Sequence, residues 1–222
     1  MARVQAWRAA IRSFICGYID AYTLLTFGVY ASFMTGNTTS AGVHAGQFKV
    51  GAAGHSLLPI PFFMLGIFSG TYMVPKDRPR TLLWQSISIA IVLIMVVVAG
   101  YAAWPGWLSV MLLSFAMGLT NTTVTSVGTQ AVSLGFMTGD LNNLAKEVAE
   151  WLKGKPLDHA KGAWDTPFHR VRVLASLWTT FFMGAIVGVV VSSRVGVRML
   201  LLPALTLFAL ALIERTPAAP HR

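Results

Sequence analysis

The sequence predicts an all-α membrane protein with six transmembrane helices, arranged as two three-helix repeats of inverted topology whose first and fourth spans are broken. Three observations favour this class: an apolar composition, basic residues placed between apolar segments, and motifs that occur twice. Of the 222 residues, 55% are hydrophobic and 11% are charged, whereas soluble domains carry roughly a quarter charged residues. Because so few charged side chains cannot cover a water-exposed surface, we expect a polytopic membrane protein. Its partner would be the lipid bilayer that surrounds its helices.

Six apolar segments could cross a hydrocarbon core of about 30 Å as helices. We expect them at residues 11–34, 56–74, 81–101, 108–137, 171–191 and 199–213. The fourth would be about 45 Å long as a straight helix, so we expect a break within the polar run 120–128. We also expect Pro59 and Pro61 to kink the second span or to delay its start.

Shorter elements are expected between these spans. The stretch 40–54 is too polar to face lipid along its whole length and should form a re-entrant or interfacial helix. Residues 140–153 are amphipathic, with Asp140 placed as the N-cap. Residues 192–198 should form a tight turn.

The net charge of +9 has two interpretations, nucleic-acid binding and cytoplasmic loops. The positive residues occur in short runs between apolar segments, which is typical of cytoplasmic loops, so we expect no nucleic-acid partner. With a cytoplasmic N-terminus, all but three of the 17 Lys and Arg residues lie on the cytoplasmic side; the exceptions are Lys49, Arg194 and Arg198. This distribution predicts six spans with both termini in the cytoplasm.

Three motifs recur in the same order in the two halves of the chain. FMTG at 33–36 returns at 136–139, GYID at 17–20 resembles GLTN at 118–121, and FFMLG at 62–66 resembles FFMG at 181–184. Residues 1–104 and 105–222 would therefore be the two repeats. Because each repeat holds an odd number of spans, the halves must be inverted relative to each other, the common plan of secondary transporters.

Asp20 is the only acidic residue well inside a predicted span, and its repeat counterpart is Asn121. Inserting an ionised carboxylate there costs roughly 2.5–3.5 kcal/mol. Asp20 should therefore be neutral, paired or facing water, and the pair could form a proton or cation site beside a hydrogen-bonding site. The alternative is that Asp20 caps a helix break or bonds to neighbouring Thr and Tyr side chains.

The other candidate residues have both a functional and a structural interpretation. The two Thr-Gly turns either present backbone N–H groups to a solute or only turn the chain; they comprise Thr35, Gly36, Asn37, Thr138, Gly139 and Asp140. The hydroxyl groups of Tyr18, Thr23 and Thr123 either line a path or bond to their own helices. Four glycines at small-xxx-small spacing should pack helices within the bundle or at a homodimer interface: Gly66, Gly70, Gly184 and Gly188.

Catalytic and metal-binding chemistry is not indicated. No phosphate-binding loop, zinc-protease motif or serine-hydrolase motif occurs, so we expect neither an enzyme nor a cofactor. His159 and His169, with two aspartates between them, are interpreted as exposed loop residues rather than metal ligands. The single cysteine, Cys16, lies in an apolar segment and is expected to be buried.

The motifs GYIDA at 17–21 and FMTGNT at 33–38 resemble the YoaK family of bacterial inner-membrane proteins, a family with a domain of unknown function. The resemblance extends over almost the whole chain, including residues 118–121 and 138–139. It implies a multi-span protein of the bacterial inner membrane, and it implies no particular activity.

We therefore expect a small transporter or permease for an unidentified small solute, which would sit between spans one and four. Asp20 would couple a proton or bind a cationic group, and Asn121 with the threonines would orient the solute. One alternative is a channel, whose flux would not saturate and would ignore a proton gradient. The other is a membrane scaffold that acts through residues 140–153 and transports nothing.

Overall fold

The computed structural model describes residues 2–72, 78–127, 130–132, 134–135, 137–154 and 166–214. Outside these ranges lie Phe136 of the second FMTG motif, Gly128 at the end of the expected break, His159, and the tail 215–222.

The described chain is almost entirely helical. Its helices are α1 (Ala2–Phe27), α2 (Met34–Gly46), α3 (Val50–Leu57), α4 (Pro59–Tyr72), α5 (Arg78–Tyr101), α6 (Gly106–Asn121), α7 (Met137–Leu152), α8 (Pro167–Val195), the 3-10 helix η1 (Gly196–Leu200) and α9 (Leu201–Glu214). Two short strands, β1 (Ser126–Val127) and β2 (Gln130–Ala131), pair antiparallel between α6 and α7.

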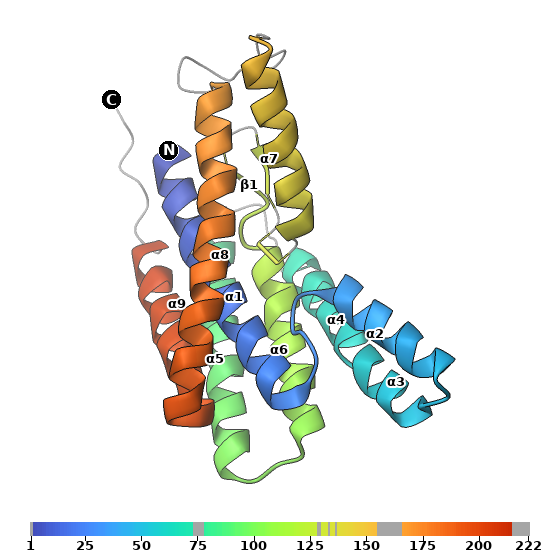
Figure 1. The fold of residues 1–222 in the computed structure, drawn as a ribbon. Coiled ribbons are helices and arrows are strands. Elements are labelled where there is room, and N and C mark those ends of the chain that lie inside the picture. Colours follow the sequence, from blue (N-terminus) through green and yellow to red (C-terminus); the bar gives the residue numbers. More distant parts are fainter. Residues whose placement is uncertain are drawn as a thin grey trace.

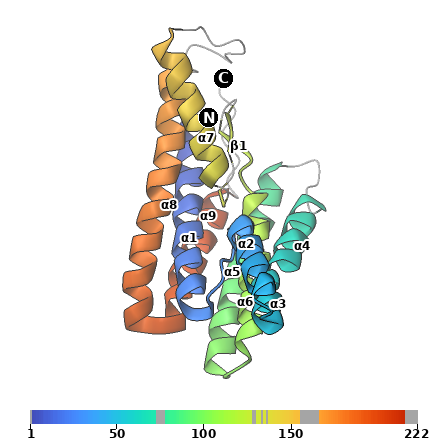
Figure 2. The same ribbon diagram turned by 45° about the vertical axis from the view of Figure 1, so that its right-hand side comes forward.

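The long helices form a bundle in which α1 packs along α8, α4 along α6, and α5 along α9 (Figure 1). The helices α1, α5 and α8 run away from the end that holds the start of α1 and the end of α9, and α4, α6 and α9 run back toward it. α2 lies against α3, and α7 lies against α8 (Figure 2). The buried core runs between the helices and includes Tyr18, Leu93, Leu113, Leu177 and Leu207.

The outer surface of the bundle is apolar. By length and composition, three helical stretches within the described chain could cross a membrane: Val50–Tyr72, Thr81–Tyr101 and Pro167–Ile213, with the shorter apolar helix Gly106–Asn121 beside them. The third stretch folds back on itself at η1 (Figure 1). Large apolar side chains such as Ile91, Phe182 and Leu205 are exposed, and so much exposed apolar surface is typical of contact with lipid. The all-α membrane class is therefore confirmed.

The helix starts differ from the predicted ones. α2 begins at Met34, so Thr35, Gly36 and Asn37 lie in its first turn rather than in a turn before it. The hydroxyl groups of Thr38 and Thr39 donate to carbonyl groups one turn earlier, at 2.9 and 3.0 Å, which lets this Thr-rich stretch remain helical.

Of two further expectations about local structure, one is wrong and one is confirmed. α7 begins at Met137, so Asp140 lies inside its first turn and is not the N-cap. The second span is interrupted at its prolines as expected: α3 ends at Leu57 and Pro59 starts α4, where a missing N–H group removes no helical hydrogen bond.

The connection after α8 also differs from the expected tight turn. α8 continues to Val195, and Gly196 at φ 55° ends it, because glycine adopts this conformation without strain. A 3-10 helix follows instead of the expected tight turn across residues 192–198.

Glycines set the close contact between α1 and α8. A side chain on Gly17 would overlap the backbone carbonyl of Phe181 in α8, and a side chain on Gly184 would overlap the carbonyl of Phe14 in α1. Larger residues at either position would push the two backbones apart.

The contact between α4 and α6 has the same construction. A side chain on Gly118 would overlap the carbonyl of Phe63 in α4, and one on Gly66 would overlap the carbonyl of Phe115 in α6. One turn beyond Gly66, a Cβ on Gly70 would overlap the Thr122 hydroxyl.

One turn beyond Gly184, Gly188 faces the backbone of Tyr18. Gly66, Gly70, Gly184 and Gly188 therefore all pack against helices of the same chain.

Candidate functional site

The first helix break folds back onto the helix that it ends. α1 stops at Phe27, Gly28 takes φ 71°, and residues 28–33 return along α1. Asp20 accepts hydrogen bonds from the Ser32 backbone N–H (2.8 Å) and from the Ser32 hydroxyl, and its side chain is only 4% exposed. The Thr23 hydroxyl oxygen accepts from the Ala31 N–H at 3.2 Å.

The same loop is fixed from its other side by α2. The buried Asn37 accepts from the Tyr30 N–H (2.9 Å) and donates from its amide nitrogen to the Tyr30 carbonyl (2.7 Å). These paired bonds satisfy backbone groups that would otherwise be unpaired away from water. Asn37 therefore anchors the loop.

The second helix break repeats this contact in a simpler form. α6 ends at Asn121, whose side-chain oxygen accepts from the Gly135 backbone N–H at 3.0 Å. The hydroxyl groups of Thr120 and Thr123 donate to backbone carbonyls within the same helix end, at 2.8 and 2.6 Å. The α6 break predicted within residues 120–128 is confirmed.

The two loops meet at Ser32 and Gly135. A Cβ on Gly135 would lie 3.0 Å from the Ser32 Cβ and 3.3 Å from the Asn121 amide nitrogen. Asp20, Ser32, Gly135 and Asn121 therefore form a continuous row across the middle of the bundle.

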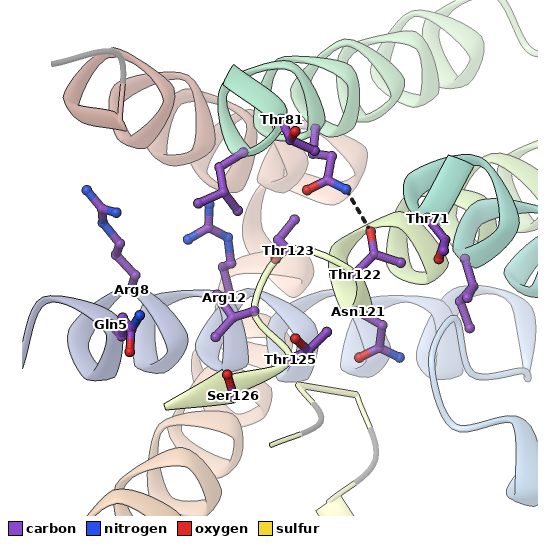
Figure 3. A pocket seen from close by; sticks show the side chains of 14 residues that line it. Gln5, Arg8, Arg12, Thr71, Thr81, Asn121, Thr122, Thr123, Thr125 and Ser126 are labelled. Carbon is purple, nitrogen blue, oxygen red and sulfur yellow. Dashed lines mark hydrogen bonds between the residues drawn. The ribbon is translucent and has the colours of Figure 1, made fainter. Parts of the chain in front are cut away.

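A cavity of 530 Å³ opens beside Asn121, toward the end of the molecule where α1 begins (Figure 3). The polar residues of its wall come from α1, α4, α5, the end of α6 and the segment that follows α6. They are Gln5, Arg8, Arg12, Thr71, Thr81, Gln85, Asn121, Thr122, Thr123, Thr125 and Ser126.

Two buried polar contacts organise this wall. Gln85 donates to the Gly70 carbonyl (2.9 Å) and to the Thr122 hydroxyl oxygen (3.0 Å). Arg12 donates to the Ser86 hydroxyl oxygen at 2.9 Å.

A second cavity, of 560 Å³, lies on the Asp20 side of the row. Besides Asp20 and Thr138, its wall is mostly apolar and includes Leu24, Phe181 and Val189. The structure thus places the two central residues of the predicted site, Asp20 and Asn121, in different cavities separated by the Ser32–Gly135 contact.

The remaining predicted residues are dispersed. Thr123 lies beside Asn121 in the first cavity, whereas Tyr18 points the other way and donates to the Met199 carbonyl at 3.0 Å. Thr35 is exposed on α2 and lines neither of these two cavities.

The other residues of the two Thr-Gly motifs differ in burial. Gly36 packs against the Phe33 ring. Asp140 is buried, and Gly139 is half-buried beside it in the first turn of α7. Of the six residues in the two Thr-Gly turns, Thr138 lines the second cavity, whose wall also includes Phe33 and Met137 from the same two motifs.

Several residues of the site were not anticipated from the sequence. Arg8 and Arg12 were counted with the N-terminal positive residues, yet both lie in α1, and Arg12 is fully buried. Gln85 could have been noticed as the one amide within the apolar stretch 81–101. Ser32 and Gly135 carry no recognisable signal, because their contact depends on how two distant loops meet.

No group of three or more potential metal-ligating side chains occurs in the part of the chain that the structure describes.

Comparisons with known proteins place this fold in a family. Residues 9–213 match the family described as "Protein of unknown function (DUF1275)". The chain is also 30% identical over 212 residues to the UPF0700 transmembrane protein RA0705 of Rhizobium meliloti (strain 1021), which covers 95% of this chain and 85% of that protein. No solved structure matches the chain. The expected membership of an uncharacterised membrane-protein family is confirmed, although neither description carries the name YoaK.

Proposed function

The chain belongs to the DUF1275 family of membrane proteins, and from its own geometry we propose that it is a secondary transporter that carries a small solute across the bacterial inner membrane. The solute would bind in the cavity beside Asn121, and Asp20 would couple its movement to a proton. The observation that carries this proposal is the row Asp20–Ser32–Gly135–Asn121, in which two broken helices meet between two cavities.

We propose further that residues 1–104 and 105–222 form a 3+3 inverted repeat. The glycine contacts support it, because Gly17 faces Phe181 as Gly118 faces Phe63, and the reciprocal pairs correspond in the same way. The helix directions support it as well, because α1, α4 and α5 run opposite to α6, α8 and α9 respectively (Figure 1). In secondary transporters with inverted repeats, solute sites lie where broken helices meet near the middle of the bilayer.

The two helix breaks also share one backbone contact. Asp20 accepts from the Ser32 N–H as Asn121 accepts from the Gly135 N–H. The difference between a carboxylate and an amide at equivalent positions would make one half of the protein sensitive to protons and leave the other half insensitive.

A proton on Asp20 would weaken the Ser32 contact. Hydrogen bonds to an ionised acceptor are roughly twice as strong as bonds between neutral groups, so protonation would loosen the bonds from the Ser32 N–H and hydroxyl. The loop 28–33 could then move away from Gly135 and change which side of the membrane reaches the solute.

For orientation we propose cytoplasmic N- and C-termini, on the basis of the positive-inside distribution. The 530 Å³ cavity would then open toward the cytoplasm, since it lies at the end where α1 begins. A tag at either terminus should resist protease added outside intact spheroplasts, and digestion of the tag would reverse this orientation.

The proposal is tested by flux into proteoliposomes that contain the purified protein. Labelled organic anions, amines and sugars would be supplied with and without an inward proton gradient, with protein-free liposomes as the control. We expect uptake of one class to saturate with concentration and to rise with the gradient. Uptake that does not saturate and ignores the gradient would indicate a channel; no flux in any class, with partner capture that requires α7, would indicate a scaffold.

A further inference from the structure

We propose that the 560 Å³ cavity on the Asp20 side of the row is a second binding site, which takes a lipophilic amine in its ammonium form. This site is distinct from the cavity beside Asn121, to which the transported solute is assigned. The inference goes beyond transport, because it concerns binding alone. It begins from a single carboxylate in an otherwise largely apolar wall.

Asp20 supplies the charge of this cavity. Among the described residues that line it, Asp20 is the one acidic residue and none is basic. The Asp20 carboxylate accepts from the Ser32 N–H and from the Ser32 hydroxyl, which are both neutral donors. A carboxylate has about four acceptor sites, so these two bonds leave acceptor capacity for an ammonium group. An anion would meet charge of its own sign here.

Aromatic rings line the same cavity. Tyr30 and Phe33 stand edge to face, with ring centroids 5.3 Å apart and an interplanar angle of 87°, and Phe181 of α8 contributes to the same wall. The faces of aromatic rings attract ammonium groups. A carboxylate together with aromatic rings therefore favours an ammonium group over a neutral or anionic one.

The loop that carries two of these rings is already held in place by the fold. Asn37 bonds to both backbone groups of Tyr30, at 2.9 and 2.7 Å, and Gly36 packs against the Phe33 ring. Groups that are ordered before a ligand arrives lose little conformational freedom on binding. The rings and the carboxylate are thus preorganised for a ligand.

The apolar part of the wall indicates that the ligand is lipophilic. Leu24 and Leu25 of α1 and Ile186 and Val189 of α8 line the cavity and are exposed. The two α8 residues belong to the stretch Pro167–Ile213, which is long and apolar enough to cross a membrane. Exposed apolar side chains in such a stretch face hydrocarbon, so a ligand would reach Asp20 through the lipid.

The size of the cavity distinguishes a lipophilic amine from other occupants. A volume of 560 Å³ falls within the roughly 300–1,000 Å³ typical of small-molecule sites, and is far larger than a bare cation needs. A lipid acyl chain would fill the apolar part but leave the Asp20 carboxylate without a cation. A molecule with an apolar body and one ammonium group matches both parts of the wall.

The test measures binding to the full-length protein in phosphatidylcholine nanodiscs, with empty nanodiscs as the blank. Phenylbutylamine is the lipophilic cation. Phenylbutanol keeps its apolar body without the charge, phenylbutyrate reverses the charge, and ethylamine keeps the charge without the ring. No flux is needed, so a protein that binds phenylbutylamine without transporting any solute would support this site and contradict the proposed function alone.

Two variants address the two parts of the wall. Asp20→Asn removes the charge, and its matched control is Glu150→Gln, which removes an exposed carboxylate on α7. Ala21→Phe fills part of the cavity, and its matched control is Ala149→Phe at an exposed position of α7. Thermal unfolding of each purified variant checks that it is folded.

We expect phenylbutylamine to bind saturably, about ten- to a hundredfold more tightly than phenylbutanol, as bonds to a charged group contribute. Phenylbutyrate should not bind, and ethylamine should bind at least about tenfold more weakly than phenylbutylamine, because it buries little apolar surface. Asp20→Asn should reduce the affinity for phenylbutylamine to that for phenylbutanol. Ala21→Phe should weaken binding of both, and neither control variant should change it.

Four results would overturn the assignment: no saturable binding of phenylbutylamine above the blank, equal affinities for phenylbutylamine and phenylbutanol, equal affinities for phenylbutylamine and ethylamine, or wild-type binding by both Asp20→Asn and Ala21→Phe. Equal affinities for the amine and the alcohol would identify a purely apolar cavity, suited to a lipid chain. None of these results would contradict transport through the cavity beside Asn121.

Discussion

Replacing Asp20 with Asn should abolish the response of uptake to a proton gradient and lower gradient-driven accumulation about ten- to a hundredfold. The carboxylate accepts two bonds from Ser32, and changes in bonds to a charged group are worth roughly 1.5–3 kcal/mol. An amide can still accept the Ser32 N–H, as Asn121 does with Gly135, so the variant should fold. The measurement is solute accumulation in proteoliposomes at a series of imposed pH gradients.

Asn121→Asp provides the reciprocal control, because it places a second ionisable group at the equivalent position. We expect it to retain coupling through Asp20 and to alter the pH profile. If Asp20→Asn accumulated solute with the wild-type response to pH, Asp20 would only hold the loop 28–33 in place.

Replacing Gly118 with Ala should lower thermal stability, by about 1–3 kcal/mol or more, because the new methyl group would overlap the Phe63 carbonyl. The contact is with backbone, which cannot rotate away as a side chain can. The matched control is Gly42→Ala in α2, where a Cβ meets nothing within 4 Å; it should be neutral or stabilise by roughly 0.5–1 kcal/mol, as expected for glycine to alanine in an exposed helix.

The two variants would be compared by their midpoints of thermal unfolding in the same detergent. Because Gly17 makes the equivalent contact with Phe181, Gly17→Ala should behave as Gly118→Ala does. Equal midpoints for Gly118→Ala and Gly42→Ala would show that the helices separate without penalty, and the glycines would then not determine the packing.

Much of the helical framework could be predicted because it depends on local composition. The break in the fourth span follows from the polar run after Leu119, and α6 does end at Asn121. The amphipathic helix before Gly154 follows from its periodicity, although it begins at Met137 rather than after Asp140. Helix starts were harder to predict because hydroxyl groups bonding within the helix kept Thr-rich stretches helical.

The site could be predicted only in part. Asp20 and Asn121 were recognisable as polar residues in apolar surroundings, and their loops do meet at Ser32 and Gly135. The burial of Arg12 was missed because Arg12 looks like an ordinary positive residue flanking a membrane span. Its burial beside Ser86 of α5 depends on how distant segments of the chain meet.

The central claim, that the cavity opens and closes around a solute, is tested most directly by the labelling rate of Thr125→Cys. Thr125 is exposed within the cavity, and the native Cys16 is buried and should react little. A membrane-impermeant maleimide would be applied from the side on which α1 begins, with Lys153→Cys as an exposed control outside the cavity.

We predict that a proton gradient or a saturating transported solute changes the labelling rate of Thr125→Cys severalfold and leaves that of Lys153→Cys unchanged. A Thr125→Cys rate that stays the same under every condition would contradict the account, since it would describe a fixed cavity rather than a transport site.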